Sequence, residues 1–170
     1  MMIPAKYLKS ENFFQMRGVY TLVLHLCTEN VSLRVGKLGK FKLRGGYYLY
    51  TGSALGKGAL SLGGRIRRHL KKQKVMRWHI DYLLSLKEVN ISSIVLAEVK
   101  EKIECELNWL LKKKIKGRIL IPNFGSSDCK FRCGSHLLYV GKGDPLQKVV
   151  DIYKTLTFNV IILKESDFLE

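Results

Sequence analysis

Acidic residues and long apolar runs are scarce in this sequence. Only 14 Asp and Glu stand against 30 Lys and Arg, so the formal net charge is +16. The lack of a long uncharged apolar run, and of a basic amphipathic helix with a clean apolar face, argues against a membrane partner. A compact body with this charge attracts polyanions over roughly 8 Å in physiological salt. Nucleic acid is therefore the expected partner, and a charge that serves only solubility is the alternative.

The features of a secreted protein are also missing. Residues 1–15 contain no apolar leader segment. Cys27 lies in an apolar strand-like run, Cys105 in a helical run, and Cys129 and Cys133 in a short polar segment, which is a poor layout for a disulfide framework. A cytoplasmic location with reduced thiols is therefore expected.

Hydrophobic periodicity predicts the secondary structure, and a 46% share of hydrophobic residues in a chain of 170 predicts one folded domain. The predicted strands are Val19–Cys27, Val31–Val35, Phe41–Tyr50, Ile91–Val99, His136–Val140 and Thr157–Leu163. The predicted helices are a segment that begins near Gly64, then Trp78–Leu86, Glu101–Lys114 and Pro145–Tyr153. We expect the first two strands to form a β-hairpin, and Gly45 and Gly46 to bend the third strand.

These elements predict an α+β fold with a small central antiparallel β-sheet flanked by helices. The central sheet is expected to contain the strands at Val19, Val31, Tyr47 and Ile91. A C-terminal extension adds a further strand and helix. The expected parts of the chain are an N-terminal segment (1–17), a core (18–115) and an extension packed on the same domain (116–170).

Two tripeptides stand on predicted strands ahead of a basic helix. Gly18-Val19-Tyr20 is followed about thirty residues later by Tyr50-Thr51-Gly52, and then by a helix written R-I-R-R-H-L from Arg65. Each tripeptide alone is commonplace, but their order before this helix is restrictive. In that order they resemble the GIY-YIG nuclease domain, and the resemblance extends from residue 18 to about residue 115.

Within that group, the chain is most similar to a poorly characterised stand-alone family that also occurs fused to endonuclease III-type DNA glycosylases. The supporting segments are YTGSALG from Tyr50, RRHL from Arg67, WHIDYLL from Trp78, ECEL from Glu104, FGSSDC from Phe124 and SHLLY from Ser135. The resemblance implies an endonuclease that acts on DNA in repair or processing, with one Mg²⁺ or Mn²⁺ ion and a repair enzyme as a candidate partner. A non-cleaving nucleic-acid-binding module and, less favoured, an RNA-processing factor are the alternatives.

The resemblance also implies the catalytic residues. Tyr20 and Tyr50 are expected to place their hydroxyls in one pocket that faces Arg65 from the helix, and His69 corresponds to a position that varies between His and Tyr. Glu106, two residues before Asn108, matches the metal-binding glutamate of the family, with Glu104 as the fallback. His79 lies about where some homing endonucleases of this class carry a second histidine.

These residue types suit phosphodiester hydrolysis on general grounds. Negative charge that builds on the phosphate oxygens would be opposed by the guanidinium of Arg65 and by a hydrated cation held at Glu106. A tyrosine that accepts a proton must have its pKa lowered from about 10, so His69 is the rival base.

Alternative interpretations of the same residues stay open at this point. The side chains of Glu104 and Glu106 point about 200° apart on a helix, so both cannot easily bind one ion. The long glycine-rich loop after Gly52 leaves Arg67 or Arg68 as substitutes for Arg65. The basic residues expected to contact nucleic acid are Lys57, Arg67, Arg68, Lys71, Lys72 and Arg77, although a charge run is more often a solvated helix face.

A second group of polar residues follows the predicted core. Cys129, Cys133 and His136, with Asp128 beside them, have spacings within the loose range of structural zinc sites, and Cys105 could complete three cysteines and one histidine. The paired tight knuckles of a strong zinc motif are missing. The sequence therefore favours reduced, half-buried loop thiols, and structural zinc is the alternative.

Overall fold

The computed structural model describes residue 8, residues 10–156 and residues 159–168. The described strands are β1 (Gly18–Leu26), β2 (Val31–Val35), β3 (Gly39–Leu43), β4 (Gly46–Ala54), β5 (Val89–Glu98), β6 (Leu137–Gly141) and β7 (Val160–Lys164). The α-helices are α1 (Glu11–Gln15), α2 (Leu62–Leu70), α3 (His79–Leu84), α4 (Glu104–Ile115) and α5 (Leu146–Leu156). In the part of the chain that is described, no helix combines the length and the apolar character needed to cross a bilayer.

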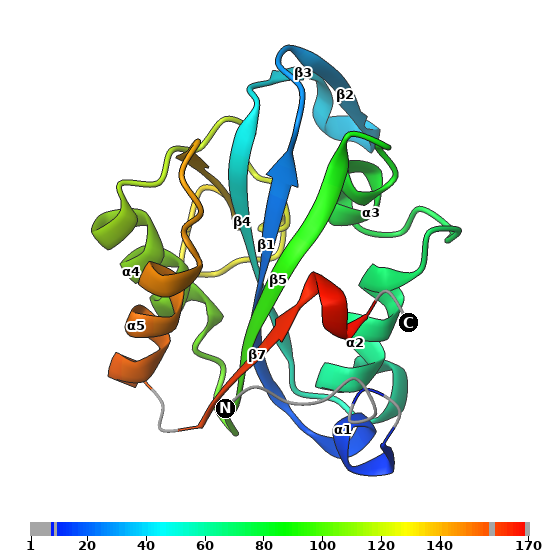
Figure 1. The fold of residues 1–170 in the computed structure, drawn as a ribbon, viewed down its shortest axis with the longest axis vertical. Coiled ribbons are helices and arrows are strands. Elements are labelled where there is room, and N and C mark those ends of the chain that lie inside the picture. The colour runs from blue at the N-terminus through cyan, green and yellow to red at the C-terminus, as the bar shows by residue number, and fades with distance from the viewer. Residues whose placement is uncertain (1–7, 9, 157–158, 169–170) are drawn as a thin grey trace.

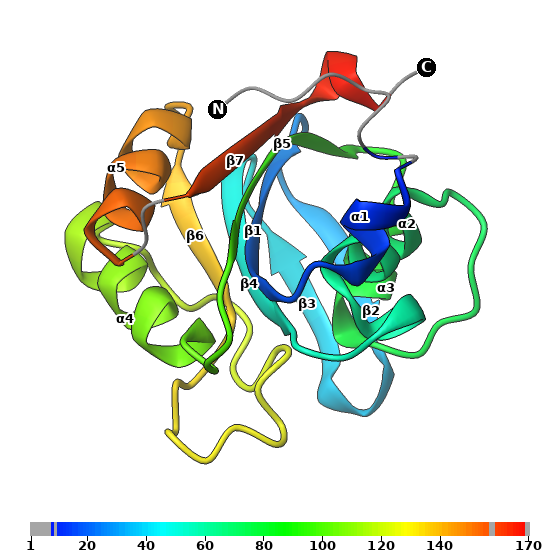
Figure 2. The same cartoon turned by 90° about the horizontal axis from the view of Figure 1, so that it is seen from below.

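A five-stranded antiparallel sheet forms the centre of the molecule, in the order β6-β4-β1-β5-β7. Helices α4 and α5 cover one face of this sheet (Figure 1). Figure 2 shows α1, α2, α3 and the β2–β3 pair on the opposite face. The predicted α+β class, with a central antiparallel sheet flanked by helices, is confirmed.

Strand β1 supplies side chains to both layers of the core because its residues alternate between the two faces of the sheet. Tyr20, Leu22 and Leu24 belong to the hydrophobic cluster under α1, α2 and α3. Val19 and Val23 belong to the second cluster, under α4 and α5. All five side chains are at most 1% exposed, so β1 is buried on both faces, as expected for the middle strand of a covered sheet.

The β2–β3 pair corrects two predictions from the sequence. The predicted hairpin between the first two strands is wrong, since β2 pairs with β3 in a separate two-stranded sheet and β1 pairs with β4 and β5. The predicted bent strand Phe41–Tyr50 is two strands, which separate before Gly46. Gly46 has a positive φ of 130°, and a Cβ there would lie 2.5 Å from the carbonyl oxygen of Gly141 in β6. The strand therefore changes direction where only glycine fits.

The C-terminal third of the chain completes the central sheet. Strands β6 and β7 are the two outer strands of this sheet, and α5 connects them along the chain. The predicted strand Thr157–Leu163 corresponds to β7, although residues 157 and 158 lie outside the described part. Helix α1, which the sequence did not predict, buries Phe13 against α2. Residues after 115 are thus part of the same sheet as the predicted core.

Candidate active site

A pocket of about 430 Å³ lies where β4 extends beyond its outer neighbour. Strand β6 pairs with β4 only over Tyr47–Tyr50. The later residues of β4 keep β1 as their neighbour in the sheet, and Thr51, Gly52 and Ser53 line the pocket. Segments far apart in the sequence meet here. The lining residues are Tyr20, Tyr50, Thr51, Gly52, Ser53, Leu55, Arg65, Arg77, Trp78, His79, Lys102, Glu104, Gly125, Ser127, Asp128 and His136.

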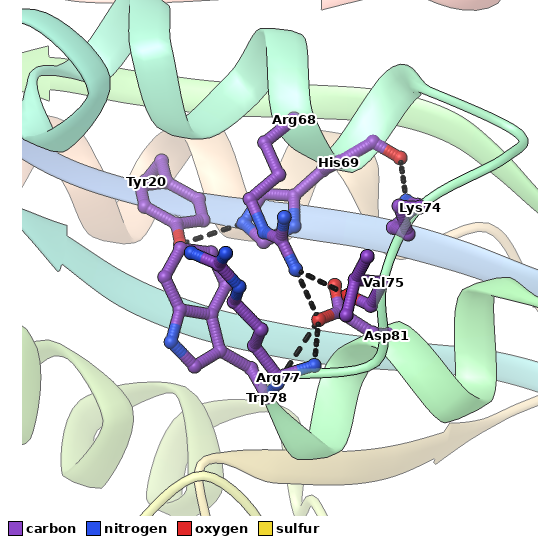
Figure 3. A network of polar contacts seen from close by, with 8 residues as sticks. All are labelled: Tyr20, Arg68, His69, Lys74, Val75, Arg77, Trp78 and Asp81. Atoms are coloured by element: carbon purple, nitrogen blue, oxygen red, sulfur yellow. Dashed lines mark hydrogen bonds and ion pairs between the residues drawn. The ribbon is translucent and has the colours of Figure 1, made fainter.

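The two motif tyrosines line this pocket from neighbouring strands. Tyr20 stands opposite Gly52 in the β1–β4 register, and its hydroxyl lies 2.8 Å from Nε2 of His69 on α2. Figure 3 shows the Tyr20 ring and the His69 imidazole directed toward each other. Tyr50 lies on β4 with its ring edge-on to His69, at a centroid separation of 6.2 Å. The structure therefore brings Tyr20, Tyr50 and His69 together at one pocket wall.

Burial controls the protonation of these three groups. Burial and the neighbouring Tyr50 raise the pKa of Tyr20 well above its ordinary value, and burial likewise raises the pKa of Tyr50, while Arg65 acts to lower both. Burial, reinforced by Lys74, lowers the pKa of His69 to about 3. Near pH 7, all three are therefore neutral. A complete proton transfer from Tyr20 to His69 is strongly uphill. The contact between them is therefore a hydrogen bond between two neutral groups, which orients the Tyr20 hydroxyl.

Gly52 leaves room for the Tyr20 hydroxyl. A Cβ at position 52 would lie 2.5 Å from the Tyr20 hydroxyl oxygen, a separation that real contacts do not allow. We expect Gly52→Ala to lower the free energy of unfolding by about 1–3 kcal/mol, because the buried Tyr20 ring must shift. Urea unfolding measures this change. Gly143→Ala, where a Cβ meets nothing within 4 Å, is the matched control, and equal stabilities for the two variants would contradict the expectation.

Arg65 reaches the pocket across the face of Trp78. Its Cζ lies 4.4 Å from the centroid of the Trp78 ring, and the Cζ of Arg68 lies 4.5 Å from it, since the two arginines are three residues apart on α2. The Nε of Arg65 is buried and has no hydrogen-bond partner among the described residues. Arg65 is thus held by stacking, which leaves guanidinium donors available to a ligand.

Arg68 is committed to a structural network. Its Nη2 lies 2.6 Å from Oδ2 of the fully buried Asp81, and the same oxygen accepts hydrogen bonds of 2.9 Å from the backbone amides of Arg77 and Trp78 (Figure 3). Asp81 therefore caps the start of α3 and fixes Trp78, on which Arg65 lies. Sequence reasoning did not identify Asp81, although a carboxylate in the first turn of a helix is a known capping signal.

The remaining predicted basic contacts are only partly gathered at the pocket. Arg77 lines it, but the guanidinium of Arg67 lies 5.6 Å from the ring of Phe14, beside a different hollow. Arg67 and Arg68 are therefore not at the pocket, because Arg67 lies over Phe14 and Arg68 binds Asp81. A further set is exposed and does not line the pocket: Lys57, Lys71 and Lys72.

Glu104, and not Glu106, is the carboxylate that faces the pocket. Glu104 is 8% exposed and lines the pocket, with its Oε1 3.1 Å from Nζ of Lys102. Glu106 is exposed and lies on another surface, beside Trp109. The structure therefore places Glu104, the fallback, at the pocket with Tyr20 and Arg65, and it places Glu106 elsewhere. Helix α4 begins at Glu104 and turns that side chain toward the sheet, on the face that also buries Leu107.

The loop before β6 closes one side of the pocket. Phe124 is buried and packs edge-on against Tyr50, with centroids 6.1 Å apart, and its ring centroid lies 5.6 Å from that of His79. The amide of Gly125 donates to Nδ1 of His79 at 3.0 Å, which leaves the proton of neutral His79 on Nε2. Asp128 in the same loop adds a second carboxylate to the pocket lining.

Three cysteines and one histidine meet next to this loop. Cys105, Cys129, Cys133 and His136 place their ligand atoms within 4.8 Å of one another, and none of the three thiols is in a disulfide. This Cys3His cluster can bind a metal ion. The structure thus joins Cys105 to the other three residues, which the sequence left as an alternative, while Asp128 faces the pocket.

One known protein family matches this chain. The family model described as a domain of unknown function, DUF123, matches residues 19–158. The chain belongs to the DUF123 family. No curated protein and no solved structure matches it. The matched region of DUF123 runs from β1 through α5, so it includes Tyr20, Arg65, Glu104 and the Cys3His cluster.

Two features of this DUF123 domain were missed by sequence reasoning. Neither Trp78 nor Asp81 was among the predicted site residues, yet they position Arg65 and the start of α3. A signal was present for Asp81, an acid three residues after Trp78 at the start of an apolar helix. No pattern in the sequence indicates that Arg65 and Arg68 share one indole ring.

Proposed function

We propose that this DUF123 domain is a divalent-metal-dependent endonuclease of the GIY-YIG type that hydrolyses phosphodiester bonds in DNA. The observation that carries the proposal is the convergence of Tyr20, Tyr50, Arg65 and Glu104 on one pocket. These residues come from β1, β4, α2 and α4, so no single local structure explains their meeting. Together they supply a cation, a carboxylate and hydroxyl groups, which are the groups that the reaction needs.

Arg65 supports the proposal through its free donors. Hydrolysis of a phosphodiester increases the negative charge on the phosphate oxygens, and a guanidinium binds two such oxygens at once. Stacking on Trp78 fixes the plane of the Arg65 side chain, while its buried Nε is unpaired in the described residues. A phosphate oxygen would satisfy this donor. Arg65 therefore binds and orients the scissile phosphate.

Glu104 is the residue that would hold a catalytic Mg²⁺ or Mn²⁺. A single carboxylate is a reasonable protein ligand for Mg²⁺, which keeps several waters and takes other oxygens from the substrate phosphate. Such an ion supplies charge neutralisation at the phosphate and a more acidic bound water. In the protein alone, Lys102 offsets the charge of Glu104. The Cys3His cluster is a different kind of site, since thiolate ligands favour Zn²⁺ over Mg²⁺.

The hydrogen bond between Tyr20 and His69 supports a role for Tyr20 in proton transfer. With its pKa at about 3, His69 is a poor base near neutral pH, so we assign it the positioning of the Tyr20 hydroxyl. Arg65 already opposes the effect of burial on the pKa of Tyr20 and Tyr50. A bound cation would act in the same direction. Tyr20 would accept the proton of the attacking water as a phenolate, once the charges of Arg65 and the bound cation have made it release its own proton to solvent.

The net charge of +16 supports a polyanionic substrate, and the basic residues Arg77 and Lys102 line the pocket itself. We favour DNA over RNA because of the resemblance to GIY-YIG endonucleases. The same resemblance supports a role in repair or processing, with a repair enzyme as a partner. Reduced thiols support a cytoplasmic location.

The proposal is tested by comparing Arg65→Ala with Arg67→Ala, an arginine of the same helix that points elsewhere. We expect Arg65→Ala to reduce cleavage about 10²–10³-fold, because one donor to the developing charge is lost. Arg67→Ala should remain within about threefold of wild type, since it removes only a surface charge. Cleavage is measured on plasmid, flapped and single-stranded DNA with Mg²⁺ or Mn²⁺.

DNA binding is measured in parallel by fluorescence anisotropy at two salt concentrations. Affinity should fall steeply as salt rises, because counterions are released when phosphates are bound. Wild-type protein that binds but cuts none of the substrates would refute the nuclease proposal and favour the non-cleaving module. Normal cleavage by Arg65→Ala would refute the assignment of Arg65.

A further inference from the structure

Three thiols and an imidazole form a compact cluster beside the pocket. The Sγ of Cys105 lies 3.4 Å from that of Cys129, and the Sγ of Cys129 lies 3.3 Å from that of Cys133. Nε2 of His136 lies 3.8 Å from the Sγ of Cys105. A tetrahedral ion with Zn–S bonds of about 2.3 Å and a Zn–N bond of about 2.0 Å separates its ligand atoms by roughly 3.5–3.8 Å. The cluster therefore needs only small adjustments to surround one ion.

The cluster joins three separate parts of the fold. Cys105 lies in the first turn of α4. Cys129 and Cys133 lie in the loop between α4 and β6, and His136 immediately precedes β6. His136 is held there by its backbone, which donates to the carbonyl of Phe124 at 2.8 Å and accepts from the amide of Thr51 at 3.1 Å. Polar groups that converge from independent elements, without local sequence constraint, indicate a common ligand.

We propose that Cys105, Cys129, Cys133 and His136 bind one Zn²⁺ ion. Three thiolates and one imidazole are a soft ligand set that selects zinc over magnesium or manganese. Four protein ligands complete a tetrahedron and leave no open position, so the site is structural. A disulfide between two of the thiols would leave the third unpaired, whereas one ion uses all three.

The position of the ion gives it a further role, which rests on the proposed nuclease function. In the sequence, Cys105 directly follows Glu104, and Cys129 directly follows Asp128. Two of the proposed zinc ligands are therefore adjacent in the chain to the two carboxylates that line the pocket. His136 is at once a ligand of the ion and part of the pocket lining. Zinc therefore ties the start of α4 to the loop and keeps Glu104 at its place in the pocket.

Metal content tests the proposal directly. Wild-type protein, supplied with ZnCl2 and then dialysed, should hold one zinc per chain by mass spectrometry of the metal, and Co²⁺ in its place should give the intense visible absorption of tetrahedral thiolate ligation. After the same dialysis, Cys129→Ser and Cys133→Ser should each hold at most about one tenth of the zinc that wild type holds. Cys27→Ser is the matched control, because Cys27 is exposed and outside the cluster. Wild-type protein without zinc, or with a disulfide among these thiols, would overturn the proposal.

Limited trypsin digestion tests the site without any variant. Lys130 and Arg132 are exposed in the loop between two proposed ligands, so removal of zinc by a chelator should speed cleavage there by at least about tenfold. Cleavage at Lys71 and Lys72, which are exposed elsewhere, is the internal control. Equal rates at Lys130 and Arg132 with and without zinc would contradict the proposal. Neither measurement uses DNA, so failure of the nuclease proposal would leave the zinc result interpretable.

Discussion

Glu104→Gln will reduce DNA cleavage by at least about a thousandfold, whereas Glu106→Gln will leave it within about twofold of wild type. The substitution keeps the volume of the side chain and removes the charge that would hold the divalent ion. Glu104 lines the pocket with Tyr20 and Arg65, while Glu106 is exposed on another surface. The two glutamates stand on one helix, two residues apart, so the pair separates a role at the pocket from a general effect on α4.

The rate is measured at saturating Mn²⁺, and Mn²⁺ binding is measured by calorimetry on the same samples. Glu104→Gln should also lose Mn²⁺ binding while it keeps the circular dichroism of wild type. Lys102, the ionic partner of Glu104, is 54% exposed, so its ammonium group can turn to water without a large loss of stability. Equal loss of activity in both variants, or loss only in Glu106→Gln, would show that the pocket carboxylate is misassigned.

Asp81→Ala will lower the free energy of unfolding by about 2–4 kcal/mol at pH 7. The carboxylate is completely buried, and its Oδ2 accepts from the guanidinium of Arg68 and from the amides of Arg77 and Trp78. The expected loss lies below that of a fully buried ion pair because the side chain of Arg68 is 22% exposed and can recover some hydration. Urea unfolding measures the change.

Asp151→Ala is the control for this substitution, since Asp151 is an exposed acid on α5 whose hydrogen bond is to Gln147 on the same helix. We expect its effect on the free energy of unfolding to stay within about 0.5 kcal/mol. A similar loss in both variants would mean that the Asp81 network does not stabilise the fold.

The stabilisation by Asp81 also depends on pH in a definite direction. Burial acts to raise the pKa of Asp81, but the amides of Trp78 and Arg77 and the guanidinium of Arg68 overcome it and hold that pKa below its ordinary value. A carboxyl group with a lowered pKa in the folded state stabilises fully above its unfolded pKa of about 3.9 and loses this contribution as pH falls through its folded pKa. The difference between wild type and Asp81→Ala should therefore be constant from neutral pH to about 5 and shrink below about 4. A difference that grows on acidification would contradict this account.

The secondary structure was accessible from the sequence because each element has a clear local signal. Strand β1 and helix α4 were predicted to within a few residues, since their apolar positions recur at the periods of a strand and a helix. The pairing of strands was not accessible in the same way. Val31–Val35 was assigned to the central sheet because it follows β1 after a short turn, but which edge a strand joins depends on long-range packing.

The choice between Glu104 and Glu106 shows how far helix periodicity could have been used. Leu107 and Leu111 are the buried leucines of α4, and Glu104 precedes them by three and seven residues, on the same face. Glu106 does not share that face. The resemblance favoured Glu106 by its spacing to Asn108, whereas the phase of the helix favours Glu104.

The stacked and clustered side chains depend on tertiary structure. Arg65 was expected to face the pocket, but its contact with Trp78 requires the loop between α2 and α3 to fold back, which no local signal predicts. The Cys3His cluster is similar, because Cys105 lies 24 residues before Cys129 and the spacing alone is not that of a tight zinc knuckle. Sequence reasoning preferred unligated thiols, and the structure brings all four ligand atoms together.

The outer position of β6 and β7 sets a lower limit on the length of a usable fragment. A chain cut near residue 115 would retain Tyr20, Tyr50, Arg65 and Glu104, but β4 and β5 would become open edges of a three-stranded sheet. Unpaired edges of this kind recruit strands from other molecules. A fragment chosen only to contain the nuclease-like motif would therefore aggregate before it could be assayed, and inactivity of such a fragment would say nothing about the chemistry of the pocket.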